Sequence, residues 1–235
     1  LGINPSNYIQ KIAYKLSLFY AKLTLKGNYY DKGGFWGKSL VRSVELYISK
    51  GYNNVIVSVA PFHNAIHLIP LISKYRDVNF IVDFRDPWIN NKTAYGYESL
   101  SIQRKDYEIQ NQKKVLNNYN YVVSVAETMT NYFRSKSSFP NCLTIANGYD
   151  KEDFKTPQIT NKNNGFINLL FSGSFYSGAE YLLNDLNSAL LKLKNENSKL
   201  YNKIKIKFIG NIPFSTNFYV KSNPSIFQFV GKIKL

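Results

Sequence analysis

The stretch "DFRDPW" (83–88) places two carboxylates and a guanidinium directly after a short apolar run. At the end of a strand, Asp83 or Asp86 could accept hydrogen bonds from substrate hydroxyls or act as a base. Arg85 could bind a phosphate or hold the carboxylates in place. A structural turn fits equally well, with Arg85 paired to one of the aspartates and Trp88 as a lid over the sheet edge. The residue types alone leave both interpretations open.

A second stretch, "FSGSFYSG" (171–178), is rich in glycine and serine and lies between a predicted strand and a predicted helix. Backbone N–H groups of such a loop, with a helix N-terminus behind them, suit a diphosphate. The loop contains neither a Gly-Lys-Ser/Thr motif nor a G-x-G-x-x-G motif. Since similar turns often bind nothing, phosphate binding and a simple connection both fit.

The two histidines, His63 and His67, lie four positions apart at a predicted helix start. No further metal ligands are evident and no H-E-x-x-H motif occurs, so a metal pair is not expected. One ring is expected to pack or cap while the other faces a substrate, although a core role fits each. Glu108, Glu127 and Asp150 lie near turns, where helix capping is the default expectation.

The composition is that of a globular protein, with 235 residues, 44% hydrophobic and 19% charged. The single cysteine excludes an intrachain disulfide, and a cysteine- or histidine-rich metal site is not expected. No G-x-S-x-G motif is present, which argues against serine hydrolysis. Because the sequence starts without Met and stops straight after a strand-like run, we expect a fragment of a larger protein.

The formal net charge of +15 suggests an anionic partner, although a composition rich in Asn, Lys, Ile and Tyr explains it equally well. Nucleic acid is not expected, since there is no arginine-rich run and no recognisable nucleic-acid-binding motif. Apolar residues from Ile9 to Leu23 fall at helical spacing with lysines between them. Such a helix could lie on an anionic bilayer. Packing against its own domain is the stronger expectation.

Strand-like and helix-like segments alternate along the chain, which predicts βαβ units and parallel sheets. Pro70 is expected to kink or break its helix. Ligands of such sheets bind beyond the carboxyl ends of the strands. The predicted strands are 53–60, 78–84, 121–126, 141–146, 166–173, 203–210 and 226–233, and the predicted helices are 61–77, 98–118, 127–136 and 179–197.

Taken in order, several stretches resemble the bacterial family-4-type glycosyltransferases of the surface-polysaccharide subgroup, over roughly residues 30–215. The most specific are "FIVDFRDPW" and "LTIANGYDKEDF"; "GGFWGKSL", "VIVSVAPFHNAIHLIPL" and "INLLFSGSFYSG" accompany them. The resemblance implies an α/β GT-B-like architecture, with two incomplete Rossmann-like domains whose parallel sheets face each other across a cleft. The expected domains are 1–155 on the acceptor side and 166–235 on the nucleotide-sugar side, joined by a linker at 156–165.

The resemblance also implies a set of site residues. Those expected at the catalytic cleft are His67, on the acceptor side, and Asp83, Arg85 and Asp86. Those expected to bind the donor are Gly173, Ser174 and Gly178 of the glycine loop, with Asn147 and Gly148 of the interdomain turn. Members are typically retaining and need no metal or other cofactor.

The implied partners are a nucleotide-sugar donor, a glycan or lipid-linked acceptor and an anionic membrane surface, in the cytoplasm at the inner face of the plasma membrane. Three departures from the family pattern imply that the fragment alone is inactive. The Arg and Lys that many members carry after the glycine loop are absent, and the first strand and a late acidic pair, E-x7-E, would lie outside Leu1–Leu235.

Three other functions stay open. A nucleotide-sugar epimerase of the same architecture would need acid and base groups near the sugar. A non-catalytic nucleotide-sugar-binding protein is favoured by the missing Arg and Lys. A basic nucleic-acid-binding protein would bind DNA in a strongly salt-dependent way.

Overall fold

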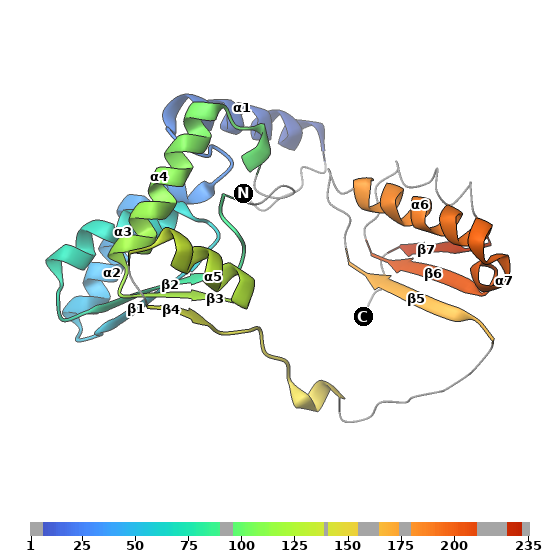
Figure 1. Cartoon of the computed structure of the whole chain (residues 1–235). Coiled ribbons are helices and arrows are strands. Elements are labelled where there is room, and N and C mark those ends of the chain that lie inside the picture. The colour runs from blue at the N-terminus through green and yellow to red at the C-terminus, as the bar shows by residue number, and fades with distance from the viewer. Residues whose placement is uncertain are drawn as a thin grey trace. The chain divides into compact units, whose positions relative to one another are not determined.

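The computed structural model describes residues 7–89, 96–138, 141–154, 165–173, 180–210 and 225–231. The chain divides into two compact units, Leu1–Tyr149 and Asp150–Leu235. Each unit is built on its own parallel β-sheet (Figure 1). The α/β class with parallel sheets is therefore confirmed. The predicted linker lies, except for Gly165, outside the described residues.

The sheet of the first unit has four parallel strands in chain order, β1-β2-β3-β4. Short apolar, β-branched runs form them, as expected for a buried parallel sheet. Their bounds are β1 Asn54–Val59, β2 Asn79–Phe84, β3 Tyr121–Ser124 and β4 Cys142–Thr144. All four predicted strands of this half are confirmed within a few residues.

Three crossover helices pack on one face of this sheet (Figure 1). They are α3 His63–Lys74, α4 Ile102–Asn118 and α5 Glu127–Lys136, with α2 Gly37–Ser49 packed against α3. Short 3-10 turns lie at η1 Lys32–Phe35 and η2 Tyr97–Ser99. The sequence pattern did not indicate α2. Of the kink or break expected at Pro70, the break is wrong, because α3 continues through this residue; the kink stays a prediction.

The core of the first unit forms where alternate strand residues meet the helices. On β2, Phe80, Val82 and Phe84 are fully buried in the main apolar cluster, which also holds Leu68 of α3 and Leu116 of α4. Successive strand residues point to opposite faces. Asp83, between Val82 and Phe84, therefore points to the face away from the helices.

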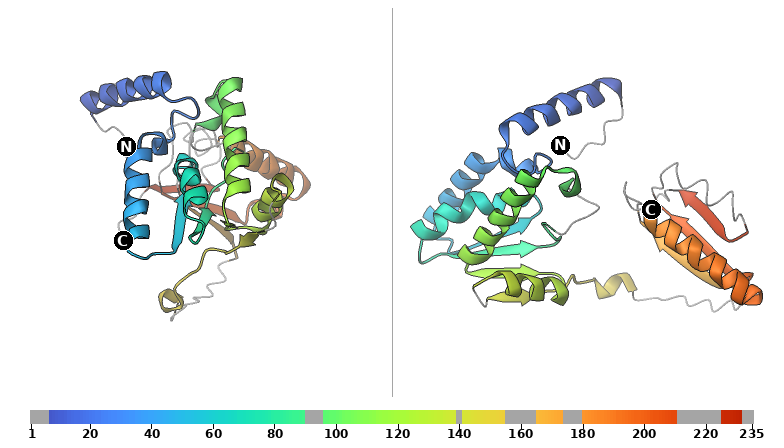
Figure 2. Two further views of the ribbon diagram at one scale, coloured as in Figure 1. Left: turned by 90° about the vertical axis from the view of Figure 1, so that its left-hand side faces the viewer. Right: turned by 45° about the horizontal axis from the view of Figure 1, so that its top comes forward.

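Helix α1 (Tyr8–Thr24) begins with Asn7 as its N-cap and lies at the periphery of the first unit (Figure 2). Its only buried residue is Ala21. The expectation that its apolar stripe packs against its own domain is therefore wrong: most of that stripe is exposed among the described residues.

The second unit has three parallel strands in the order β5-β6-β7. Their bounds are β5 Ile167–Ser172, β6 Ile204–Ile209 and β7 Phe227–Gly231; the helices are α6 Glu180–Glu196 and α7 Ser198–Tyr201, and a 3-10 turn, η3, covers Lys151–Phe154. Leu183 and Leu190 of α6 are buried in a core with Ile206 and Phe208 of β6. The predicted strands and helix of this half are confirmed.

Glycines end all three strands of the second unit. Gly173 follows β5, Gly210 follows β6 and Gly231 ends β7. The Gly173 N–H donates to the Ile209 carbonyl (2.9 Å) and the Gly210 N–H to the Gly231 carbonyl (2.9 Å). Gly210 has a φ of +134°, and a Cβ there would collide with the carbonyl of Gly173. The close approach of these two strand ends therefore requires glycine at position 210.

We predict that Gly210→Ala destabilises the second unit by about 2 kcal/mol or more, because both the backbone angle and the strand contact are lost. Hydrogen exchange at the β5 and β6 amides measures this loss locally. Gly165→Ala is the matched control, since its φ is also positive (+74°) but a Cβ built there meets no atom within 4 Å; it should cost about 1 kcal/mol. Equal effects of the two substitutions would show that the strand contact does not matter.

Candidate functional site

Asp83, Arg85 and Asn147 form one hydrogen-bonded group at the carboxyl end of β2. Arg85 donates from Nε to Oδ2 of Asp83 (2.7 Å) and from Nη1 to Oδ1 of Asn147 (2.7 Å). Its backbone N–H donates to the Val59 carbonyl (3.3 Å), which ties the loop to the end of β1. The structure thus joins "DFRDPW" to "NGYD", whose first residue follows Arg85 by 62 positions.

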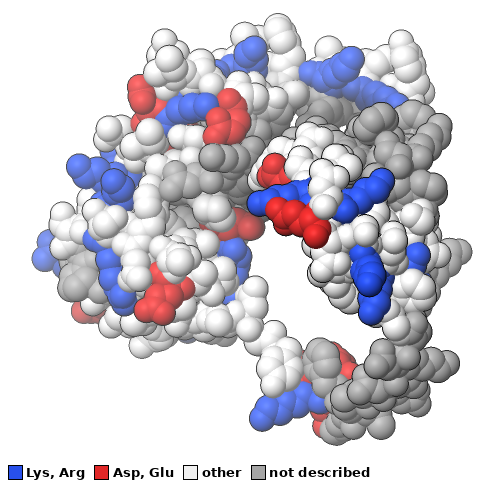
Figure 3. All heavy atoms as spheres, turned by 45° about the vertical axis from the view of Figure 1, so that its right-hand side comes forward, with Lys and Arg blue, Asp and Glu red and all other residues white. Residues whose placement is uncertain are grey.

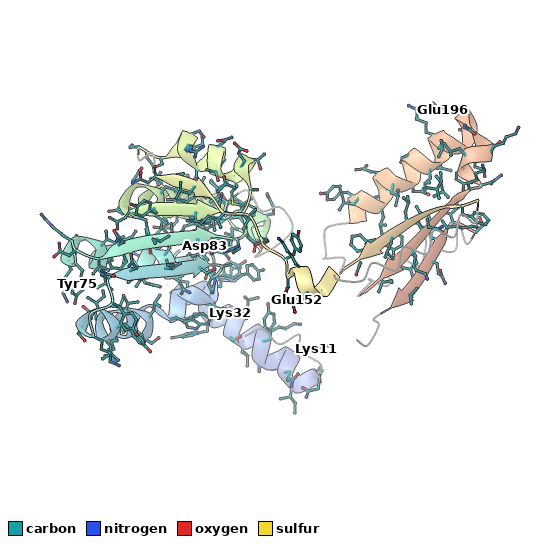
Figure 4. All side chains as sticks on the ribbon, turned by 90° about the horizontal axis from the view of Figure 1, so that it is seen from below. Lys11, Lys32, Tyr75, Asp83, Glu152 and Glu196 are labelled. Carbon is teal, nitrogen blue, oxygen red and sulfur yellow. The ribbon has the colours of Figure 1, made fainter. Side chains whose placement is uncertain are left out.

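Asp83 lies inside β2 rather than after it, in register with Ser58 of β1 and Val123 of β3. Figure 4 shows Asp83 at the end of the sheet away from Tyr75. The residue is 9% exposed, and its Oδ1 is buried without a hydrogen-bond partner among the described residues. A buried carboxylate oxygen left in this state can accept a hydrogen bond from a hydroxyl group.

Asp83 and Arg85 also line a pocket of about 440 Å³ on the sheet face opposite the helices. The rest of its lining is mainly apolar and comes from all four strands and the residue after β4, at Ile56, Ile81, Tyr121, Val123, Leu143 and Ile145. Arg85 keeps 42% of its side chain exposed. A guanidinium has five N–H donors, so Arg85 can bind an anion while it holds Asp83 and Asn147.

The other residues of the loop differ in their placement. Asp86 is half-buried. Trp88 is 2% exposed, stacks on Phe62 with ring centroids 5.4 Å apart, and donates from Nε1 to Oε2 of Glu108 (2.7 Å). The interpretation of Trp88 as a lid over the sheet edge is therefore wrong. Its indole anchors the loop in the core.

Glu108 was expected to cap a helix, and that interpretation is also wrong. It lies in the middle of α4 and is fully buried. Its carboxylate accepts from the backbone N–H of Asn28 (2.6 Å), from Nε2 of His63 (2.9 Å) and from Nε1 of Trp88. One side chain thus joins the loop after α1, the start of α3 and the "DFRDPW" loop.

A second buried carboxylate, Asp31, supports the same corner of the unit. Its Oδ2 accepts from the backbone N–H groups of Phe62 (2.8 Å) and His63 (3.1 Å), and its Oδ1 from Gly33 (2.8 Å). Burial raises the pKa of Asp31 above its ordinary value of 3.8, although the charge of His63 and these N–H groups act in the opposite direction. Asp31 therefore fixes how the chain enters α3.

The pKa of His63 is set by competing effects. Burial lowers this pKa, but the hydrogen bond to Glu108 and the charges of Glu108 and Asp31 outweigh burial, so the pKa lies above its ordinary value of 6.5. The imidazolium form is thus stabilised between two carboxylates. A core role is what the structure shows for His63.

His67 is half-buried, and its hydrogen-bond partner is not a member of the Asp83–Arg85–Asn147 group. Its Nε2 lies 3.0 Å from the carbonyl oxygen of Gly33, to which it donates. A Cβ at Gly37 would lie 2.6 Å from Nδ1 of the ring, so the start of α2 packs closely on it. The structure does not hydrogen-bond His67 to Asp83, Arg85 or Asn147. Its role on the acceptor side stays a prediction.

The predicted donor-binding residues fall partly outside the described residues, since Ser174 and Gly178 are not among them. Gly173 lies at the glycine-lined end of the second sheet, and Gly148 is exposed with open space around it. Among the described residues, no three His, Cys, Asp or Glu side chains are grouped closely enough to hold a metal ion. Figure 3 shows Lys and Arg spread over the visible surface rather than gathered in one patch.

Solved structures similar to this chain include TarM and HepE. TarM is 13% identical with a TM-score of 0.44, over 77% of this chain and 33% of its own. HepE (Alr3699) of Anabaena, crystallised in complex with UDP, is 13% identical with a TM-score of 0.53, over 83% of this chain and 51% of its own. The chain thus spans about half the length of HepE. No known protein family and no curated protein sequence matches it.

At this level of identity the likeness to HepE shows the fold alone. That fold is the GT-B type of the glycosyltransferases, α/β with parallel sheets. The strand order and the comparison therefore confirm an α/β fold of GT-B type with parallel sheets; the facing of the two sheets across a cleft stays a prediction.

We predict that Glu108→Gln lowers the free energy of unfolding by about 3 kcal/mol, because an amide cannot accept from three donors as the carboxylate does and leaves His63 unpaired. Urea unfolding followed by the fluorescence of the buried Trp88 measures the change. Glu98→Gln provides the matched control, since Glu98 pairs with Lys105 while 55% exposed; it should change stability by less than about 0.5 kcal/mol. A similar effect of both substitutions would contradict the central role of Glu108.

Stability should also depend on pH through His63 and Asp31. Both groups bind a proton more tightly in the folded state, so each contribution is present below the unfolded pKa and is lost as pH rises through the raised folded pKa. For His63 this loss begins above pH 6.5. We predict that the melting temperature falls between about pH 6 and pH 8, and falls less in Glu108→Gln. Equal slopes in both proteins would refute the coupling.

Proposed function

We propose that the protein containing this chain is a glycosyltransferase that transfers a sugar from a nucleotide-sugar donor to a glycan or lipid-linked acceptor. The observation that carries the proposal is the Asp83–Arg85–Asn147 group, which unites the two stretches with the most specific resemblance to family-4-type glycosyltransferases. The GT-B-type fold shared with HepE, a protein crystallised with UDP, supports it.

In this proposal Arg85 acts as the central cation of the group. It holds Asp83 in place and keeps exposed N–H donors for an anionic substrate group. Oδ1 of Asp83, which has no hydrogen-bond partner among the described residues, accepts a hydrogen bond from a sugar hydroxyl. We assign His67 and Asp86 to the acceptor side, and Gly148 with the glycine loop from Gly173 to Gly178 to the donor diphosphate. We assign the protein to surface-polysaccharide synthesis at the inner face of the plasma membrane.

The mechanism we propose is retaining transfer without a metal ion. Negative charge builds up on the leaving diphosphate, and donors already oriented toward it lower the barrier. Backbone N–H groups of the glycine loop and the positive field of a chain with net charge +15 would supply that stabilisation. No metal or other cofactor is needed for this step.

A thermal-shift screen tests the donor. We expect the protein to be stabilised by one class among UDP-, GDP-, ADP- and CMP-sugars, because a ligand that binds only the folded state raises its melting temperature. UDP-sugars are the first choice, given the UDP in the HepE crystal. No shift with any donor at millimolar concentration would remove the donor-binding proposal.

Arg85→Ala tests the site itself. We predict a loss of transfer of at least about 100-fold, measured as release of nucleoside diphosphate from the responding donor in the presence of acceptor. The protein should stay folded, because the partly exposed pair contributes only about 1 kcal/mol. Arg76→Ala, an exposed arginine after α3, is the matched control and should keep full activity.

If Arg85→Ala unfolds the first unit while donor binding is otherwise normal, the turn is structural and the catalytic assignment fails. Asp83→Asn, which keeps the shape of the side chain, separates the two interpretations further. It should abolish transfer while the melting temperature stays within a few degrees of the original. Conversion of the donor sugar without acceptor would instead indicate an epimerase.

A further inference from the structure

Helix α1 presents an apolar face to solvent. Its large apolar residues alternate at spacings of three and four, which places them on one side of the helix. These residues are Ile9, Ile12, Leu16, Phe19 and Leu23, with exposed fractions of 77%, 43%, 64%, 62% and 69%. Exposure of this degree along a continuous stripe is unusual for a helix that only packs on its own domain.

A different face of α1 does the packing. Leu18 is half-buried and Ala21 is 3% exposed, and together with Tyr14 they line a pocket of about 220 Å³ shared with Phe35 and Trp36. At 100° per residue, Leu18 and Ala21 lie on the side opposite Leu16 and Leu23. The apolar stripe is therefore not needed to attach the helix to the unit.

The C-terminal end of α1 is firmly held. Arg104 of α4 donates to the carbonyls of Lys22 (2.6 Å), Leu25 (2.7 Å) and Gly27 (2.5 Å). Cations at these positions satisfy the last carbonyls of a helix and interact well with its dipole. These hydrogen bonds fix the helix end, so the apolar stripe stays turned toward solvent.

The charges along α1 all have one sign. Lys11, Lys15, Lys22 and Lys26 are the only charged residues between Tyr8 and Lys26. The first three fall along one border of the apolar stripe, and Figure 4 shows Lys11 on the part of α1 farthest from the sheet. A basic border beside an apolar face is the pattern of a helix that lies in the surface of an anionic bilayer.

We propose that α1 is a docking surface for anionic lipid, with Ile9, Ile12, Leu16, Phe19 and Leu23 inserted among the acyl chains and the lysines at the headgroups. The surface continues at Tyr20, whose ring stacks on Phe35 with centroids 6.2 Å apart. Tyrosines at such a boundary keep the ring in the apolar layer and the hydroxyl in water.

The same spacing of three and four also suits pairing with a second copy of the helix. The charges argue against that occupant. In an antiparallel pair the lysines beside the stripe would face lysines of the partner, and in either orientation no acidic side chain of α1 could compensate them. An anionic bilayer satisfies both the apolar stripe and the lysines. This proposal does not depend on the sugar-transfer proposal.

Sedimentation with vesicles tests the proposal directly. We expect the protein to bind vesicles of equal parts phosphatidylglycerol and phosphatidylcholine and to bind pure phosphatidylcholine at least tenfold more weakly. Binding should weaken as salt is raised, because the lysine contribution is screened. Equal binding to both vesicle types, or none to either, overturns the proposal.

Two pairs of substitutions separate the apolar and basic contributions. Leu16→Asp with Phe19→Asp should weaken binding about 100-fold, and Lys11→Glu with Lys15→Glu about 25-fold or more. The matched controls are Leu46→Asp on α2 (53% exposed) and Lys113→Glu with Lys114→Glu on α4, which should bind as before. All of these positions are exposed, so the melting temperature should not change.

A fluorescent reporter tests whether the stripe enters the lipid. The chain has two tryptophans, Trp36 and the buried Trp88. In the variant Trp36→Phe with Phe19→Trp, the new indole is the one that can meet lipid. Its emission should shift to the blue on anionic vesicles and be quenched by brominated acyl chains. Unchanged emission while the protein binds would show that another surface makes the contact.

Self-association is the remaining outcome. If the protein dimerises without lipid, Leu16→Asp with Phe19→Asp abolishes the dimer, and vesicles do not bind, then a second copy covers the stripe and the lipid proposal is wrong. Sedimentation equilibrium measures this. A loss of transfer in Arg85→Ala with normal vesicle binding would leave the lipid proposal intact.

Discussion

The first unit depends on one buried carboxylate side chain. Glu108 is fully buried, and its carboxylate accepts hydrogen bonds from Asn28, His63 and Trp88. An ionised carboxylate is costly to bury unless it is paired and hydrogen-bonded. Because each donor belongs to a different segment, the cost is offset only when all three segments take their native positions together.

That requirement positions the candidate site. The indole of Trp88 is fixed by Glu108 and by stacking on Phe62, so the chain after β2 must turn back into the core within a few residues of Phe84. Arg85 is left at the surface of this turn, where it reaches both Asp83 and Asn147. Glycine at position 27 belongs to the same arrangement, because a Cβ there would collide with Oε1 of Glu108. A deeply buried interaction thus determines where an exposed guanidinium lies.

The sequence predicted correctly the strands and helices that are determined by neighbouring residues. Short apolar runs predicted the strands of both sheets, and the alternation of these runs with helices predicted the parallel pairing. It was a poor guide where burial decides the role. Glu108 lies in a polar helix and looked like a cap, although only the packing of α4 shows which polar face is inside. Trp88 looked like a lid because nothing in the local sequence identifies its partner, which is 20 residues away.

Some missed features were nevertheless within reach of the sequence. Phe80, Val82 and Phe84 alternate, so Asp83 had to point to the other face of the sheet rather than beyond its edge. Two features of this unit depart from the usual distribution of polar and apolar residues. Glu108 is polar and buried, and the stripe on α1 is apolar and exposed. The first demands partners inside the unit and finds them. The apolar stripe has no partner among the described residues, and the lysines beside it indicate an anionic partner. Glu108 thus holds the segments of this unit together, whereas the stripe on α1 is the surface that contacts another molecule.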